Sequence, residues 1–495
     1  MLRLHGNRKV LCDGLTRRDL LHIGGLGAFG LALHDVLGSN QAQAKPANLG
    51  PKFGQAKSCI LIYKYGSPPQ HETFDPKPLA PAEIQGEMKA IPTSVPGIHI
   101  GDHLPKIARI MDRLTVVRSL THRFPLHGTV YALSGVEDVD TRIEAQPRNS
   151  RQWPFIGSLV DYFEDRRSGG PPPEMPRNIA LPFPMGSKNE IPPLAGPYGA
   201  MIGSRYDPIY TNFSAEGTMS APEIVAGRAF RDPLFGIRPT DRLHLGEAAL
   251  VERDSARLDL RRSLLAQFNQ ARRNLDASER TQTFTHQQQT AFSLLTSGKM
   301  HDALDYTRET MRIRELYGMT LFGQSCLAAR RLIEVGAKFV TVIWDAYGLN
   351  AGSWDTHHNH YGRLKDFLLP VFDQTFSALI LDLEQRGLLD ETLVLVISEH
   401  GRTPQIDSRP RGAGRHHWSR AYSQVYAGGG MGRGNLIGRT DQHAGDVVES
   451  PISPKDILAT AFYLLGIDPE STFTDPAGRP LPFTGTGVLR PELIG

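Results

Sequence analysis

Cysteine is the scarcest chemistry-bearing residue of this chain, with 3 among 495 residues. Cys12 lies in the N-terminal segment, while Cys59 and Cys326 lie far apart, one within an expected strand and the other within an expected helix. This spacing excludes a disulfide-dense scaffold and shows no motif for a thiolate metal site or a cysteine nucleophile. It leaves a single disulfide open.

The chain also lacks an excess of charge and a long apolar run. Its 55 Lys and Arg residues balance 52 Asp and Glu residues, for a formal net charge of +3, which falls to +1 without residues 1–44. That balance gives no basis for a nucleic-acid partner. We also expect no integral membrane span, since the apolar run at residues 23–33 is shorter than the roughly 20 residues that cross a bilayer. Oligomeric state stays open.

The first 44 residues have the pattern of an export signal. Arg17 and Arg18 precede the short, glycine-rich apolar run, and Ala42-Gln43-Ala44 supplies small residues at a cleavage point. An amphipathic N-terminal helix is the alternative, but it does not account for these three features together. We therefore predict a twin-arginine signal peptide over residues 1–44 and a mature protein that is periplasmic or extracellular. That pathway exports folded proteins, which suits an inserted metal.

The remainder, residues 45–495, is predicted to be an α/β domain. Apolar, largely β-branched runs predict buried strands, and a helical pattern over residues 364–388 between two of them predicts a parallel crossover. Residues 136–240 are rich in Pro, Gly and Arg and are predicted to be a loop-rich insertion over the sheet edge; residues 241–334 are predicted to be a helical segment. The predicted strands include residues 59–65, 114–120, 338–344, 392–398 and 423–427.

Histidines and carboxylates follow the predicted strands. Glu399 and His400 come directly after the buried run 392–398, and Glu72 lies beyond the turn that ends the first strand. Two further histidine-rich clusters span residues 354–360 and 414–418. Ligands of open α/β sheets bind beyond the carboxyl ends of the strands, and imidazole with carboxylate suits zinc, manganese or iron. Oxygen-only sites would suit calcium or magnesium.

These positions predict one or two divalent metal ions, with zinc or manganese favoured and calcium as the alternative. For Glu72, hydrogen bonding to a ligand is the competing role. His358, His360 and His416 are interpreted as solvated or hydrogen-bonded side chains. The metal-ligand candidates are Glu72, Asp355, His357, Glu399, His400 and His417.

Four ordered motifs together resemble the secreted DUF1501 family, a sulfatase-like branch of the alkaline phosphatase superfamily. The resemblance covers nearly all of the mature chain and implies a three-layer α/β sandwich with a mostly parallel central sheet. It also implies that the six candidates bind the metals. Glu72 and Glu399 stand where the superfamily usually has Asp, and Asn359 occupies a usual His position. The motifs are Gly66–Pro78, Trp354–His357, Ser398–Pro404 and Gly414–Trp418.

The resemblance leaves the nucleophile undecided. Superfamily hydrolases place Ser, Thr or modified Cys at a helix N-terminus, but here that position falls near Pro125. Thr121 and, less favoured, Thr129 are the nearest hydroxyls, with capping or turn roles as alternatives. His127 is predicted as a proton donor or anion contact. Arg402 is predicted either to pair with an anionic substrate or to brace the turn through carbonyl groups.

Two functions follow from these residues. The first is an exported metal-dependent hydrolase of phosphate or sulfate esters, with attack by Thr121 or by a metal-activated hydroxide. The second is a catalytically silent, exported binding or accessory protein of the same fold that recognises anionic polysaccharide. The predicted partner is accordingly an anionic small-molecule or polysaccharide ester.

Overall fold

The central sheet joins strands that lie far apart in the sequence. In the computed structural model, the described residues are 50–136, 146–169, 173–189, 196–220, 231–245, 298–348 and 353–495. The predicted signal peptide lies outside these residues. Residues Lys52–Gly495 form one compact unit.

Eight strands form the sheet, and only β13 runs against its neighbours. β13 pairs antiparallel with β10 and β4, whereas the other neighbouring pairs are parallel. The strand order is β14-β4-β13-β10-β1-β9-β5-β6. The strands are β1 (Ser58–Lys64), β4 (Leu114–Leu120), β5 (Asn178–Leu181), β6 (Ile209–Tyr210), β9 (Phe339–Trp344), β10 (Thr392–Ile397), β13 (Tyr422–Ala427) and β14 (Asn435–Ile437).

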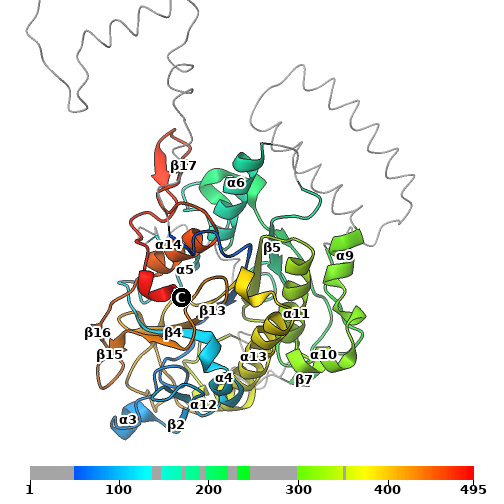
Figure 1. Cartoon of the computed structure of the whole chain (residues 1–495). Helices are drawn as coiled ribbons and strands as arrows, with labels where there is room; N and C mark the ends of the chain where they lie inside the picture. Colours follow the sequence, from blue (N-terminus) through cyan, green and yellow to red (C-terminus); the bar gives the residue numbers. More distant parts are fainter. Residues whose placement is uncertain are drawn as a thin grey trace, which may run out of the picture. The chain divides into compact units, whose positions relative to one another are not determined.

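Helices cover both faces of this sheet (Figure 1). Alternate residues of β1 point to opposite sides: Ile60 and Ile62 join the apolar core that contains the helices of one layer, while Tyr63 reaches Thr129 at the start of a helix in the other. The first layer contains α4 (Pro105–Arg109), α10 (Met311–Tyr317), α11 (Leu321–Glu334) and α13 (Leu369–Gln385). The second contains α5 (Thr129–Ser134), α6 (Ile156–Ser168) and α14 (Pro454–Leu464).

This architecture confirms the predicted α/β fold with a mostly parallel sheet between two helical layers. The three central strands are buried throughout and consist mainly of apolar and β-branched side chains, as parallel strands covered on both faces require. Their register aligns Tyr63 with Ile343 and with Ile397. The segments that follow these residues therefore leave the sheet at one edge.

Two parts of the sheet differ from the expectation. β5 and β6 lie in the segment predicted to be a loop-rich insertion, which also contains the 13-residue helix α6. Their four and two residues are too short to show a strand pattern. β13 was correctly placed as a strand, but nothing in a single apolar run encodes its antiparallel direction. Of the predicted helical segment, residues 246–297 lie outside the described residues.

Short elements connect the layers. The helical ones are α3 (Ala82–Gln85), η2 (Met111–Arg113), η4 (Ala200–Ile202), η5 (Ser204–Tyr206), α9 (Gly298–Leu304), η7 (Tyr306–Arg308), α12 (His360–Arg363), η8 (Leu364–Leu368), η9 (Leu389–Glu391) and η10 (Pro491–Leu493). The paired strands outside the sheet are β2 (Ala90–Pro92) with β3 (His99–Gly101), β7 (Met219–Ser220) with β8 (Arg231–Asp232), β11 (Gly401–Arg402) with β12 (His417–Trp418), β15 (Arg439–Thr440) with β16 (Val447–Glu449), and β17 (Thr472–Thr474) with β18 (Pro480–Pro482).

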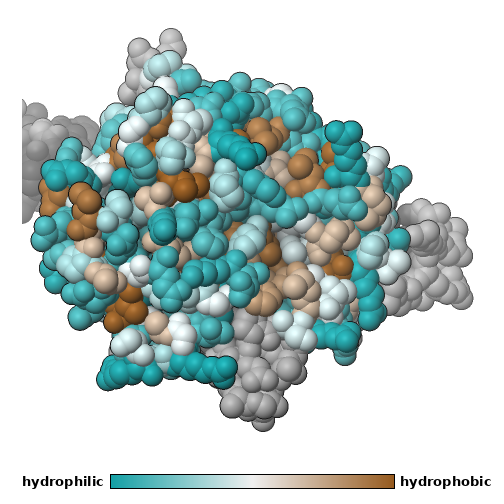
Figure 2. Space-filling model, turned by 90° about the horizontal axis from the view of Figure 1, so that it is seen from below, coloured by the Kyte–Doolittle hydropathy of each residue, from teal (hydrophilic) through white to brown (hydrophobic). Residues whose placement is uncertain are grey.

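Three general features bear on the sequence expectations. Cys59 and Cys326 are buried free thiols. Within the described ranges, no helix has both the length and the apolar character needed to cross a membrane. The face shown in Figure 2 is mainly hydrophilic, with separate hydrophobic patches among polar side chains.

Candidate metal centre

Gly66 allows three segments of the chain to meet beyond the sheet edge. It follows β1 with a φ of +96°, a left-handed conformation that favours glycine. A Cβ atom at this position would lie 2.2 Å from the backbone nitrogen of Asp355. The Gly66 N–H also donates to Glu399 Oε1 at 2.7 Å. This one glycine therefore packs the β1 turn against the segments that carry both carboxylates.

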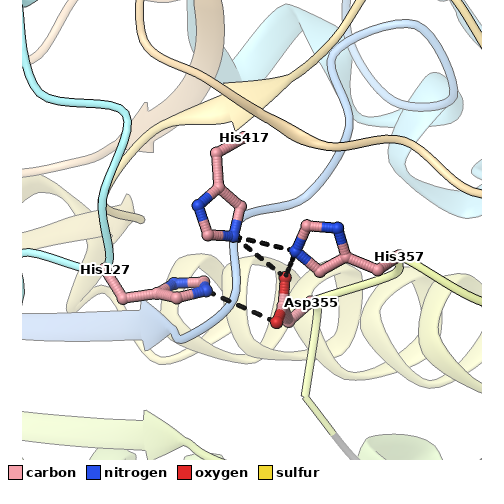
Figure 3. A group of neighbouring side chains, drawn as sticks. All are labelled: His127, Asp355, His357 and His417. Carbon is pink, nitrogen blue, oxygen red and sulfur yellow. Dashed lines mark hydrogen bonds and ion pairs between the residues drawn. The ribbon is translucent and has the colours of Figure 1, made fainter.

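The first donor group consists of His127, Asp355, His357 and His417, whose ligand atoms all lie within 4.8 Å of one another. Figure 3 shows the four side chains pointing toward one another from three separate segments. Asp355 Oδ1 lies 3.0 Å from His357 Nε2 and 3.4 Å from His417 Nε2, and Asp355 Oδ2 lies 3.4 Å from His127 Nε2. Three imidazoles thus surround one carboxylate.

The outer hydrogen bond of His417 fixes which of its nitrogens can bind a metal. His417 Nδ1 lies 3.2 Å from the carbonyl oxygen of Pro125, which can only accept. The proton therefore sits on Nδ1, and Nε2 of the neutral ring presents its lone pair to the donor group. Burial lowers the pKa of His417, which favours this neutral form.

A chain of two histidines and a carboxylate fixes His357 in the same way. Asp407 Oδ2 lies 3.0 Å from His416 Nε2, and His416 Nδ1 lies 2.9 Å from His357 Nδ1. Hydrogen bonds from Arg409 and His416 hold the pKa of Asp407 well below its usual value, so its carboxylate accepts from His416 Nε2–H. With its proton on Nε2, His416 can accept at Nδ1 from His357 Nδ1–H. That arrangement would leave the lone pair of His357 Nε2 facing inward, as in metal sites where an outer carboxylate orients the ligand.

The second donor group consists of His127, Glu399 and His400, and it shares His127 with the first. His400 Nδ1 donates to the carbonyl oxygen of Gly401 at 2.8 Å, so Nε2 carries the lone pair. This Nε2 atom is buried and has no hydrogen-bond partner among the described residues. Burial and nearby cationic groups, Arg402 first, lower the pKa of His400 well below its usual value. A buried lone pair without a donor is the feature that a metal ion would satisfy.

Glu399 is held in place by three donors. Its Oε1 accepts from Gly66 N–H at 2.7 Å and lies 2.8 Å from His127 Nδ1, while Oε2 accepts from Tyr63 O–H at 3.1 Å. Because Glu399 lies two residues beyond the end of the central strand β10, the sheet determines the position of this carboxylate.

His127 lies between the carboxylates of Asp355 and Glu399, with one ring nitrogen facing each. Burial lowers the pKa of His127, but hydrogen bonds and charges from Asp355 and Glu399 outweigh burial and raise it to about 9. The metal-free protein therefore carries an imidazolium between the two carboxylates. A divalent cation would also compensate the charge of these two carboxylates.

The donor set fits a divalent metal. Lone pairs of His357, His400 and His417 point inward, and two oriented carboxylates accompany them. This mixture of imidazole and carboxylate suits zinc or manganese better than calcium, which prefers oxygen ligands. The structure thus brings together five of the six predicted ligands and adds His127, which the sequence analysis placed in catalysis.

Glu72, the sixth predicted ligand, lies in neither group. Its Oε1 accepts from Arg415 Nη2 at 2.7 Å and from Arg415 Nε at 3.0 Å, and His360 Nε2 lies 3.5 Å away. Burial would raise the pKa of Glu72, but Arg415 and His360 hold it well below its usual value. In this structure Glu72 thus forms a buried ion pair with Arg415, and its role as a metal ligand stays a prediction.

Arg402 is fully buried, and its guanidinium group binds to other groups of the protein. Nη2 lies 2.5 Å from Asp355 Oδ1, Nε donates to Ser67 O at 3.1 Å, and Nη1 donates to Arg415 O at 3.2 Å. Of the two roles predicted for Arg402, this arrangement corresponds to the bracing role. Its charge also helps to hold the pKa of Asp355 well below its usual value against the effect of burial.

The two hydroxyl candidates lie outside both donor groups. Thr121 lines a cavity beside His417, where its backbone N–H donates to Ile452 O at 3.0 Å. Thr129 is fully buried at the first position of α5, and its Oγ1 accepts from Tyr63 O–H at 3.4 Å. Thr129 is therefore too buried to act as a nucleophile, whereas Thr121 lies in the wall of the same cavity as His417 and stays a candidate.

Sequence reasoning missed the orienting roles of Asp407, His416 and Tyr63. His416 was considered but was interpreted as a solvated side chain, and Asp407 lies in a polar turn without a motif. The adjacent pair His416-His417 could have indicated this role. His417 begins β12 and His416 precedes it, and because successive side chains of an extended segment alternate, one histidine can face the donor group while the other lies outside it.

The fold and the donor groups define an α/β protein with a candidate metal site at the carboxyl ends of its central strands. The chain belongs to the family described as "Protein of unknown function (DUF1501)", whose sequence pattern matches residues 56–493. No curated protein matches it.

Several solved structures are similar at low sequence identity. Ps i-CgsB is 12% identical with a TM-score of 0.37, covering 88% of this chain and 75% of its own. The PsFucS1 sulfatase from Pseudoalteromonas sp. is 12% identical with a TM-score of 0.35, covering 85% and 70%. The lipoteichoic acid synthase LtaP from Listeria monocytogenes is 10% identical with a TM-score of 0.33, covering 85% and 75%.

Proposed function

We propose that this chain is an exported metal-dependent hydrolase of sulfate or phosphate esters. The observation that carries the proposal is the convergence of the inward-facing lone pairs of His357, His400 and His417 on two oriented carboxylates. Structural metal sites are usually closed by four protein ligands and stabilise the fold, whereas this site lies at a sheet edge beside a cavity. That location suits binding of a substrate.

Each residue of the site has a role that follows from its contacts. Asp355, His357 and His417 would hold one metal ion, and Glu399 and His400 would hold a second or extend the first site. A bound divalent ion would polarise the ester and lower the pKa of water. Arg402 and Gly66 fix the two carboxylates, and the His416–Asp407 pair orients His357.

His127 is the residue best placed to handle a proton. Its ring faces both carboxylates and is partly exposed, with 22% of the side chain accessible. A proton held at Nε2 could pass to the departing oxygen of the alcohol group. The same imidazolium could instead bind an anionic oxygen of the ester, so His127 keeps both of the roles predicted for it.

Turnover of two simple esters tests the proposal. The mature chain loaded with zinc or manganese would be assayed with 4-nitrophenyl sulfate and 4-nitrophenyl phosphate, beside His400→Ala and His358→Ala variants. His358 is exposed and belongs to neither donor group, so it is the matched control. We expect turnover that His400→Ala abolishes and His358→Ala retains.

The competing function is a silent binding protein that recognises anionic polysaccharide. The full burial of Thr129 favours it, because a buried hydroxyl cannot reach a substrate. Metal-loaded protein that binds an ion through His400 but turns over neither ester would exclude the hydrolase and leave this second function.

A further inference from the structure

A buried histidine outside both donor groups lies next to the segments that carry them. His122 lies two residues beyond the end of β4 and is 6% exposed. Its backbone N–H donates to Ser419 O at 2.9 Å, two residues after His417 in the chain. The His122 ring contacts two tyrosine rings, with centroid distances of 4.5 Å to Tyr131 and 5.6 Å to Tyr422. These contacts fix the position of the ring.

Both ring nitrogens of His122 form hydrogen bonds. Nδ1 accepts from Phe124 N–H at 3.1 Å, so the ring proton lies on Nε2. Nε2–H then donates to the carbonyl oxygen of Glu399 at 2.7 Å. A backbone N–H can only donate and a backbone carbonyl can only accept, so the two contacts require the same neutral tautomer. His122 thus joins the loop that follows it to the segment that follows β10.

The loop of residues 123–126 has few other attachments. Leu126 is 50% exposed, and Arg123 and Pro125 are also exposed. The Phe124 ring contacts Tyr131 at a centroid distance of 6.2 Å. Within the described part of the chain, the hydrogen bonds of this loop are Phe124 N–H to His122 Nδ1, His417 Nδ1–H to Pro125 O, and the local bond from Gly128 N–H to Leu126 O at 2.7 Å. The loop therefore depends strongly on His122 for its position.

This loop contributes to both donor groups. Pro125 O accepts from His417 Nδ1–H, which leaves the lone pair of His417 Nε2 in the first group. His127 follows the loop directly and belongs to both groups, with its ring between the carboxylates of Asp355 and Glu399. Figure 3 shows His127 pointing from this segment toward Asp355. A shift of the loop would therefore disturb both groups at once.

We infer that His122 is a positioning residue of the candidate metal centre. It donates to Glu399 O and accepts from Phe124 N–H, and so holds the loop against the segment after β10. Pro125 and His127 are thereby kept within reach of the donor groups. The inference deepens the proposed function and rests on it for the ligand, a divalent metal ion. The placement of the His417 ring by the loop does not depend on a metal.

Two polar substitutions separate the contact with Glu399 from the contact with Phe124. In His122→Gln, the side-chain amide can donate to Glu399 O from nearly the position of Nε2. In His122→Asn, the shorter amide can accept from Phe124 N–H, from nearly the position of Nδ1, but does not reach Glu399 O. The matched control is Thr115→Val, which removes a buried side-chain hydrogen bond to Gly432 O at the opposite end of β4.

Zinc affinity of the folded mature chain, measured by competition with a chromophoric chelator, is the first test. We expect His122→Asn to weaken zinc binding by about 10–100-fold, as the loss of an orienting contact typically does. His122→Gln and Thr115→Val should stay close to wild type. Unchanged affinity in His122→Asn, or an equal loss in His122→Gln or Thr115→Val, would overturn the inference.

NMR of the metal-free protein tests the inference without zinc. With ring-labelled histidine, the spectra show which nitrogen of each ring carries the proton. In wild type we expect the proton of His122 on Nε2 and that of His417 on Nδ1. His417 should lose this single tautomer in His122→Asn and keep it in Thr115→Val. The opposite tautomer of His122 in wild type, or an unchanged His417 ring in His122→Asn, would overturn the inference.

The outcomes separate this inference from the proposed function. Wild-type protein that binds no zinc but shows the expected tautomers would exclude the metal-dependent hydrolase and support the role of His122 in placing the loop. Ester turnover by the zinc-loaded chain, together with a zinc affinity that is the same in His122→Asn, would support the hydrolase and overturn the positioning role.

Discussion

The Nε2 atoms of His357 and His417 lie 3.0 Å apart. Both rings use Nδ1 for an outer hydrogen bond, so two neutral imidazoles would direct their lone pairs at each other. Such an arrangement is repulsive unless a proton or a metal ion lies between the nitrogens. Hydrogen bonds made outside the donor groups therefore orient these two histidines so that both Nε2 atoms can bind one cation.

His416→Ala should weaken metal binding without removing a ligand. His416 and Asp407 fix the proton on His357 Nδ1, and loss of such an orienting contact typically lowers metal affinity by about 10–100-fold. Competition with a chromophoric chelator would measure the change, with His358→Ala as the control. Unaltered affinity in His416→Ala would show that the outer chain does not orient His357.

Glu72→Gln should lower stability and leave metal content unchanged. The substitution removes one partner of a buried ion pair and leaves the Arg415 charge uncompensated, which costs about 3–5 kcal/mol. Urea denaturation gives the free energy of unfolding, and elemental analysis of the folded fraction gives the metal content. Loss of metal with unchanged stability would restore Glu72 as a ligand.

Arg402→Ala should unfold the site rather than weaken substrate binding alone. It leaves Asp355 and several buried carbonyl oxygens without their donor, for a loss of about 3–5 kcal/mol in unfolding free energy. Arg409→Ala, at a side chain that is 86% exposed, is the control and should change stability little. A raised KM with unchanged stability in Arg402→Ala would instead indicate direct contact with an anionic substrate.

The metal-free protein should lose stability as the pH rises. The pKa of His127 is raised from 6.5 to about 9 in the folded state, so its contribution is fully present below about pH 6.5 and is lost as the pH passes through 9. At about 1.4 kcal/mol per pKa unit, the loss is on the order of 3 kcal/mol. Thermal unfolding at pH 6.5 and pH 9.5 would measure it. His127→Gln should lack this difference; an equal difference in the variant would assign it to other groups.

Much of the fold was predictable because burial on both faces leaves a clear pattern. β1, β4, β9 and β10 are found within one residue of the predicted bounds, since their runs are largely apolar or β-branched. β5 gave no such signal in its four residues, and its place beside β9 depends on contacts distant in the sequence. Strand direction, as in β13, depends on the connections and not on composition.

The position of the candidate site was predictable where its residues lie just beyond a strand. Glu399 and His400 follow β10 after a single residue, so the sheet determines their location. Glu72 also follows a strand, but its partner is decided by the side chain of Arg415, 343 residues away. Likewise, the contact between His416 and Asp407 depends on how the turn between them folds, and this cannot be read from a single sequence.

The metal content of the folded mature chain, measured by elemental mass spectrometry, tests the central claim most directly. Wild type would be measured beside His400→Ala, His417→Ala and the control His358→Ala. We predict one or two divalent transition-metal ions per chain in wild type and His358→Ala, with loss of metal in the other two variants. Metal-free wild-type protein after purification and incubation with zinc or manganese, or unchanged binding in His400→Ala and His417→Ala, would contradict the account.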